Sequence, residues 1–277
     1  MAKANGIIGN FNGKVGNVVG YRLAASANKQ TQGVRIYQPV VKNPQTYAQA
    51  EQRVKYAPVN ATYRLLKDII DRGFESKTYG IRSRNAWLSR ALKSTMIPYY
   101  LRGEVIQYPA LVQLTDGTIP SIPVDTEENR KLAIVVNVAT ELISPTTAQV
   151  SNILLERYSF LKVGDQITFV KCQIENDFMT SKALSFIINP NDGAERLDDF
   201  VVTAGKLLCW VDDENYTAGT VIISRQGSNG RHLRSSSTLS QGRDYDHHYF
   251  SDSVKEAAIQ SYMAQSSNTD WPEESVQ

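Results

Sequence analysis

Lysine and arginine side chains that could neutralise phosphate are concentrated in the first part of the chain. Residues 1–103 hold 17 Lys and Arg against 4 Asp and Glu, whereas residues 104–277 hold 13 against 24. No acidic residue precedes Glu51. Such charge asymmetry is typical of proteins that meet nucleic acid or another acidic surface. Two alternatives stay open: the basic part docks on the acidic part of a neighbouring copy, or it is a solvated surface.

Basic and aromatic side chains also share one face of a predicted helix. At 100° per residue this face carries Gln49, Arg53, Tyr56, Asn60, Tyr63 and Lys67. Aromatic rings stack on bases while cations pair with phosphates, although a polar face is also normal for an amphipathic helix. The predicted nucleic-acid contacts are the phosphate-binding Lys14, Arg22, Lys29, Arg35, Arg53, Lys67, Arg82, Arg84 and Arg90, and the stacking Tyr56 and Tyr63.

Other chemistry finds little support. The segment from Gly9 to Val15 has three residues between its glycines and no hydroxyl after Lys14, whereas a nucleotide-binding loop needs four residues and a Ser or Thr. Arginines flank the Ser- and Gly-rich segment 226–242 and could contact phosphate, but we favour a solvated hairpin there. An enzyme with an unrecognised site is therefore only a third hypothesis.

Metal and thiol chemistry is equally sparse. His247 and His248 are adjacent and point in different directions on any regular element, and no further ligand completes a zinc site. Cys172 and Cys209 lie in apolar, strand-like runs, so we expect two buried thiols. We predict no catalytic residue, no metal and no cofactor.

The elements that position these residues follow from composition. Glycines at 6, 9, 13, 16 and 20 disfavour a helix, so residues 1–42 read as an extended basic arm with one or two short strands, one of them over 34–41. Asn43 and Pro44 favour a helix start. Pro58 predicts two helical pieces or a kink near Ala57. Ser83 could cap a second helix over 84–93, and a further helix is expected over 253–263.

The second half of the chain predicts β structure. Prolines make 98–126 an irregular connection. Short runs rich in Val, Ile, Phe and Thr then follow at the rhythm of a sandwich or small barrel. The expected strands are 132–139, 148–154, 166–174, 183–188, 206–211 and 220–225.

The predicted fold class is α+β, with a Gly-rich basic amino-terminal arm and short helices before an antiparallel β-sandwich-like domain. The predicted parts are the arm (1–42), a helical basic region with a Pro-rich connection (43–127), the sandwich-like domain (128–240) and a polar tail with a short helix (241–277). No apolar run reaches the roughly 18 residues of a membrane span, so we expect no membrane partner.

Several segments resemble an uncharacterised family of Bacteroidota and gut-phage proteins. The first is the opening Gly13-Lys14-Val15-Gly16-Asn17-Val18-Val19-Gly20, and the second is the helix start Asn43-Pro44-Gln45-Thr46-Tyr47-Ala48-Gln49. The segments 79–85, 221–225 and 233–235 add weaker similarity. The resemblance implies a phage context and carries no catalytic residue.

These observations predict a phage structural, virion-associated protein that binds nucleic acid, DNA in the first place, without sequence specificity. The alternative is a virion assembly or scaffold protein whose arm binds neighbouring subunits, for example by strand addition. We expect a homo-oligomer that contacts other phage structural proteins. It would be made in the host cytoplasm and then enter the virion.

Overall fold

Helices and antiparallel sheets together build the chain, which confirms the α+β prediction. The computed structural model describes residues 13–22, 32–37, 46–76, 81–125, 131–191, 195–210, 216–227, 230, 232–242 and 245–264. Two units are distinguished, residues 1–44 with 267–277, and residues 45–266. Each unit is described by itself.

The described part of the first unit is a three-stranded antiparallel sheet in the order β1-β2-β3. Its strands are β1 (Gly13–Val15), β2 (Val18–Arg22) and β3 (Gln32–Ile36). Val15 pairs with Val18 across a two-residue turn in which Gly16 has φ 58°, a backbone conformation that glycine adopts without strain. The sequence predicted one or two strands here. The strand expected over 34–41 instead begins at Gln32 and ends at Ile36.

Two consecutive helices open the second unit. Helix α1 (Tyr47–Leu65) begins at the N-cap Thr46, whose hydroxyl accepts a hydrogen bond from the Gln49 N–H. The start predicted at Asn43 lies outside the described residues. Helix α1 continues through the buried Pro58, and the break falls at Leu66, before α2 (Lys67–Arg72). The division into two helical pieces near Ala57 is therefore wrong, because the burial of Val54, Pro58 and Val59 offsets the lost N–H. The alternative, a kink near Ala57, stays a prediction.

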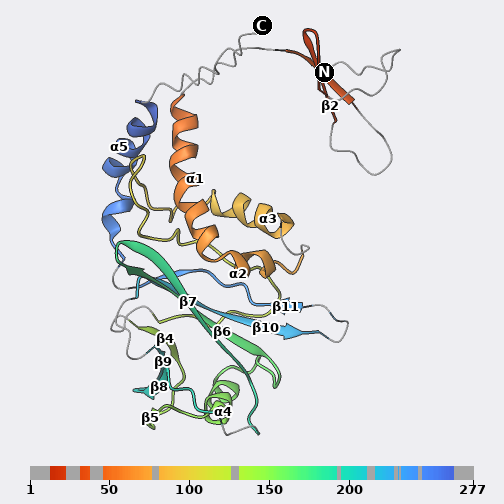
Figure 1. The fold of residues 1–277 in the computed structure, drawn as a ribbon. Helices are drawn as coiled ribbons and strands as arrows, with labels where there is room; N and C mark the ends of the chain where they lie inside the picture. The colour runs from red at the N-terminus through yellow and green to blue at the C-terminus, as the bar shows by residue number, and fades with distance from the viewer. Residues whose placement is uncertain are drawn as a thin grey trace. The chain divides into compact units, whose positions relative to one another are not determined.

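The remaining helices lie close to their predicted positions. Helix α3 (Ile81–Ala91) begins before the predicted 84–93, so Ser83 is a buried residue within the helix and not its cap. Helix α5 (Asp252–Met263) follows the 3₁₀ turn η1 (His247–Phe250) and is capped by Ser251. It packs along α1 through Ala50 and Val54 (Figure 1).

The predicted irregular connection is confirmed, because its described residues 98–125 form only isolated bridges. Ala110, Val112 and Leu114 are nonetheless buried in the core around Trp87. The Thr62 hydroxyl of α1 accepts a hydrogen bond from the Ala110 N–H at 2.8 Å. The connection therefore wraps the helices as part of their core.

A five-stranded antiparallel sheet lies under the helices, in the order β11-β10-β6-β7 with β12 paired to β10 (Figure 1). Its strands are β6 (Gln166–Glu175), β7 (Phe178–Ile187), β10 (Ala218–Gln226), β11 (His232–Arg234) and β12 (Ser240–Gln241). Three of the predicted strands correspond to β6, β7 and β10. Strand β7 lies at the edge of this sheet.

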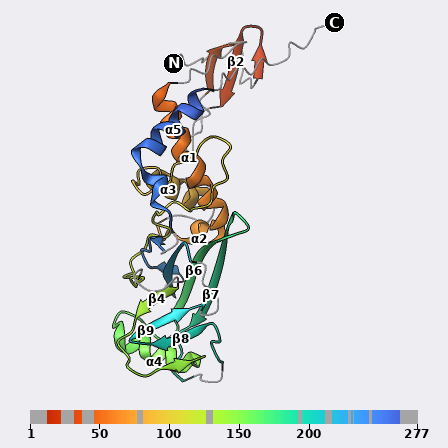
Figure 2. The same ribbon diagram turned by 90° about the vertical axis from the view of Figure 1, so that its left-hand side faces the viewer.

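A four-stranded sheet in the order β4-β9-β8-β5 lies on the side of the five-stranded sheet that faces away from the helices (Figure 2). Its strands are β4 (Leu132–Val135), β5 (Leu142–Ile143), β8 (Phe200–Thr203) and β9 (Lys206–Cys209). The strand predicted over 148–154 is wrong, because these residues belong to helix α4 (Thr147–Arg157). Thr146 and Gln149 form a capping box, and Val150 and Leu154 are buried at helical spacing.

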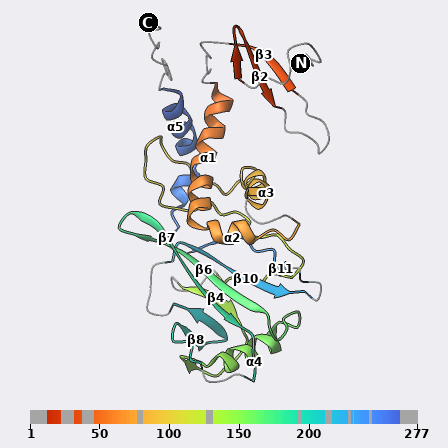
Figure 3. The same cartoon turned by 45° about the vertical axis from the view of Figure 1, so that its right-hand side comes forward.

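The two sheets share a core of aromatic and aliphatic side chains. Phe169 on β6 lies 5.1 Å, between ring centroids, from Phe200 on β8, which fits the predicted sandwich-like arrangement (Figure 3). On the other face of β6, Val170 and Cys172 join the core of the helices. Strand β6 is thus buried on both faces. The predicted boundaries between the four parts of the chain, at residues 42, 127 and 240, stay a prediction.

Candidate nucleic-acid interface

The predicted contacts in the first unit lie on its small sheet. Lys14 belongs to β1 and Arg22 to β2, but their side chains lie outside the described part of the chain, as does all of Lys29. Arg35 is an exposed residue of β3. Their role in binding nucleic acid stays a prediction.

The predicted stripe on α1 is divided into two places. Arg53 and Tyr56 line a hollow of about 430 Å³ together with Leu92 and Tyr262. Tyr56 is 41% exposed, so its ring is accessible. Lys67 belongs to α2, beyond the break at Leu66, and is separated from the stripe.

Tyr63 and Arg84 contact each other. The Tyr63 hydroxyl donates to the Asp71 carboxylate at 2.9 Å, and its ring lies 5.9 Å from that of Trp87. The Arg84 guanidinium lies 4.8 Å from the centre of the Tyr63 ring. Both side chains therefore support the packing of α1 and α2 on α3. Stacking of a base on this face of Tyr63 would require Arg84 to move.

Arg82 and Arg90 differ in their surroundings. Arg90 forms an ion pair with Asp116 at 2.9 Å and lies 5.3 Å from the centre of the Phe74 ring. Arg82 is exposed on α3. Throughout the described residues, the cations of the helical region that form no ion pair are Arg53, Arg64, Lys67, Arg82, Arg84, Lys93 and Arg102.

Two cations lie beside the junction of α1 and α2. Arg64 and Lys67 flank the junction and line a hollow of about 460 Å³, which Ser181, Lys182 and Ala183 of β7 border from the other side. The Ser181 hydroxyl donates to the Leu65 carbonyl at 3.3 Å, which ties β7 to the end of α1. Lys182 also lies 3.8 Å from Glu175. The sequence did not single out Arg64 or Lys182, because Arg64 lies off the stripe and Lys182 is distant in sequence.

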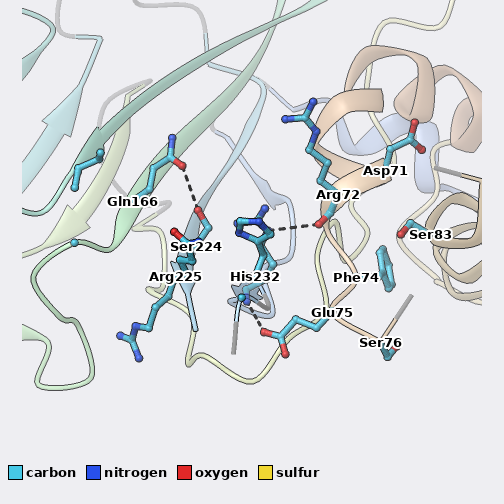
Figure 4. A pocket seen from close by; sticks show the side chains of 15 residues that line it. Asp71, Arg72, Phe74, Glu75, Ser76, Ser83, Gln166, Ser224, Arg225 and His232 are labelled. Atoms are coloured by element: carbon cyan, nitrogen blue, oxygen red, sulfur yellow. Dashed lines mark hydrogen bonds between the residues drawn. The ribbon is translucent and has the colours of Figure 1, made fainter. Parts of the chain in front are cut away.

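A larger cleft of about 1010 Å³ lies at the other end of α2. In Figure 4, Asp71, Arg72 and Ser83 come from the helices on one side, and Gln166, Ser224 and Arg225 from the sheet on the other. The Arg225 guanidinium points away from Arg72 (Figure 4).

Arg225 is held by the protein itself. Its guanidinium contacts the Asp165 carboxylate through two hydrogen bonds of 2.6 and 2.7 Å and donates to the Phe160 carbonyl at 2.8 Å. The hydrogen bond from Asp165 raises the pKa of Arg225. This arginine is a structural group of the cleft wall.

Arg234 has a different environment. Its Nε donates to the Arg72 carbonyl at 3.4 Å, and its backbone N–H donates to the Glu75 carboxylate. Burial lowers the pKa of Arg234, and the nearby charge of Arg72 lowers it further. In the part of the chain that the structure describes, the Arg234 guanidinium forms no ion pair. Two arginines therefore border this cleft at close range.

The two cysteines are buried free thiols, as predicted. Burial raises the pKa of Cys172 to about 12 and raises that of Cys209 as well, so neither forms a thiolate readily at neutral pH. Over the residues described, no three or more His, Cys, Asp and Glu side chains gather as a metal site. Among the described helices, none is long and apolar enough to cross a membrane.

Residues 10–131 match a family of unknown function (DUF6266). This match agrees with the resemblance of the amino-terminal segments to an uncharacterised family. It runs from the first strand to the end of the Pro-rich connection and so includes α1, α2 and α3. No curated protein and no solved structure matches the chain.

Proposed function

We propose that this protein is a phage structural protein that binds nucleic acid without sequence specificity through its basic amino-terminal third. The carrying observation is the set of helical-region cations that form no ion pair among the described residues. Arg64 and Lys67 are exposed and lie together. The phage context is supported by the resemblance of the opening segments.

The physical argument is electrostatic. A cation that already holds a carboxylate must give up that partner to bind a phosphate, whereas an exposed cation without one releases only counterions from the nucleic acid. Cations that contact phosphates carry no information about base sequence. The arrangement therefore favours binding that depends strongly on salt and weakly on sequence.

Fluorescence anisotropy with single-stranded and duplex DNA and RNA over a salt series tests this proposal. We expect micromolar or tighter binding at low salt that weakens as salt rises. Neutralising Arg64, Lys67 and Arg82 to Gln should weaken binding. The matched control neutralises Lys131, Lys162 and Arg196 of the sheet region and should leave binding unchanged. Absence of binding by the nuclease-treated wild-type protein at low salt would refute the proposal.

A second function is favoured by the edges of the sheets. Strands β1 and β3 form the two edges of the small sheet, and β7 is a ten-residue edge strand whose Phe178 and Ile187 are 65% and 58% exposed. Exposed edges are templates for pairing with another chain. The protein would then be a virion assembly or scaffold component whose amino-terminal segment binds neighbouring subunits.

Light scattering during size-exclusion chromatography separates the two functions. Assembly predicts oligomers that grow with protein concentration and do not need added DNA. Deleting residues 1–42 should abolish such oligomers. A monomer at every concentration, with and without DNA, would contradict the assembly function.

A further inference from the structure

The two hollows at the ends of α2 lie on the same face of the five-stranded sheet. Lys67, Asp68 and Ile69 of α2 line the smaller hollow, and Asp71 and Arg72 line the larger cleft. On the sheet side, Ser181 and Ala183 of β7 line the first, and Ile187 lines the second. Alternate residues of a strand share a face, so these residues of β7 all lie on the side of the helices.

The stretch between the hollows is not covered. Ser185 lies between Ala183 and Ile187 on β7 and is exposed, and its cross-strand neighbour Thr168 on β6 is half-buried. Gln166 and Ser224 continue the polar surface into the larger cleft, joined by a hydrogen bond of 3.4 Å (Figure 4). The two hollows are therefore the ends of one groove along α2. Its floor carries mainly hydroxyl and amide groups.

Cations stand at both ends of this groove. Arg64 and Lys67 lie at one end, and Arg72 and Arg234 at the other. The carboxylates along it are Asp68, Asp71 and Glu75. Asp71 is buried and accepts from Tyr63, and Glu75 accepts from the Thr118 N–H at 3.0 Å and from the Arg234 backbone. The accessible charge of the groove is positive.

We propose that this groove binds the sugar-phosphate backbone of a single nucleic-acid strand, an inference that rests on the proposed function. From Ser181 to Ile187 the floor extends roughly 20 Å at the rise of a β-strand. Hollows of about 460 and 1010 Å³ are the size of small-molecule sites, so a strand can enter them and a duplex cannot. Among the described lining residues no Phe, Tyr or Trp ring is exposed, so recognition comes mainly from phosphate contacts.

The test fills the groove. Ser185→Trp places an indole on the exposed floor, and Ser89→Trp places the same side chain at an exposed serine of α3 as the matched control. Both variants and the wild-type protein are titrated with a labelled oligothymidylate, its RNA equivalent and a duplex of equal length. We expect Ser185→Trp to weaken single-strand binding roughly tenfold or more, and Ser89→Trp to leave it unchanged. About four phosphate contacts in the groove predict a slope near −3 for log K against log salt.

A second variant, Glu75→Gln, tests the groove even if Ser185→Trp does not fold. Glu75→Gln keeps an oxygen that accepts from Thr118 and removes one negative charge from the groove. Single-strand binding should tighten roughly twofold at low salt.

The outcomes separate the two proposals. Weaker single-strand binding by Ser185→Trp, together with tighter binding by Glu75→Gln, supports the groove. Wild-type binding that neither variant changes overturns the groove and leaves the proposed function standing, as does a duplex bound as tightly as a single strand. Absence of any binding by the wild-type protein overturns both.

Discussion

The cations of the sheet region and those of the helical region are used differently. In the sheet region, Arg225 is bonded to the nearly inaccessible Asp165, and Lys206 lies 2.7 Å from Asp125. In the helical region, Arg64 and Lys67 face an open hollow and form no ion pair with any described residue. Arg225 and Lys206 therefore stabilise the fold, whereas Arg64 and Lys67 are available to a ligand. The predictions below test this difference, beginning with the largest effect.

Breaking the Arg225–Asp165 pair should cost the most stability. Asp165 is only 1% exposed, so Arg225→Ala leaves a buried carboxylate without its ion partner, and we expect a loss of about 3–5 kcal/mol. Urea unfolding measures it. The double variant Arg225→Met with Asp165→Leu removes both charges and should lose less. A loss below about 1 kcal/mol for Arg225→Ala would show that this pair is no more structural than a surface pair.

Alkaline pH should destabilise the fold through buried hydroxyls. Burial raises the pKa values of Tyr100, Tyr216 and Tyr245. The unfolded chain releases these protons near pH 10 while the folded protein retains them, so stability holds below about pH 10 and falls above it. Each group contributes about 1.4 kcal/mol per pH unit.

Urea unfolding at pH 9, 10 and 11 measures this loss. Tyr245→Phe should show a shallower dependence on pH, because one titrating group is removed. It also loses the 2.5 Å hydrogen bond to the Pro109 carbonyl, so the variant should be less stable at pH 9. Equal stability of the wild-type protein at pH 9 and 11 would contradict the role of these hydroxyls.

Neutralising the groove cations should separate binding from stability. Arg64→Gln with Lys67→Gln should change the unfolding free energy by less than about 0.5 kcal/mol, because neither exposed side chain has an ion partner among the described residues. Single-strand affinity should fall roughly tenfold at low salt, and the salt slope should decrease by about 0.7 for each lost contact. A large loss of stability with unchanged affinity would show that Arg64 and Lys67 stabilise the fold and do not bind the nucleic acid.

Lys55 gives the smallest expected effect and a control from the same helix. It lies 3.2 Å from Glu51, which also pairs with Lys255 of α5 at 3.2 Å. Lys55→Gln should cost about 0.3–0.5 kcal/mol and should leave the salt slope of DNA binding unchanged. If Lys55→Gln lowers that slope as much as Arg64→Gln, pairing with a carboxylate does not decide which cations bind nucleic acid.

Local patterns predicted most of the elements. Helical patterns located α1 and α3, a helix was also expected at α5, and runs rich in Val, Ile, Phe and Thr located β6 and β10. The failure at α4 has a local cause: Val150, Ile153 and Leu154 favour a strand by composition, while the capping pair Thr146 and Gln149, visible in the sequence, favours a helix. Strand β5 was missed because its two residues give too little alternation to recognise, whereas β8 was missed although β4 and β9, which are equally short, lie within predicted strands.

The candidate site was less predictable than the fold. The groove needs Lys67 beside Ser181 and Arg72 beside Arg234, and each pair is far apart in the sequence. Its floor carries mainly Ser, Thr and Gln side chains, which are ordinary residues of a sheet surface. The periodic stripe on α1 was visible, but tertiary packing uses its Tyr63 to hold Arg84 and Trp87 together.

The burial of β6 on both faces has a consequence for cooperativity. Phe169 packs in the core between the sheets, and Val170 packs in the core under the helices. Unfolding of β6 therefore exposes both hydrophobic cores at once. Amide hydrogens of β6 should therefore exchange with solvent only through global unfolding, and the helices should have no separate high-energy opening of their own. The cations of α1 and α2 would then keep their spacing until the whole of residues 45–266 unfolds.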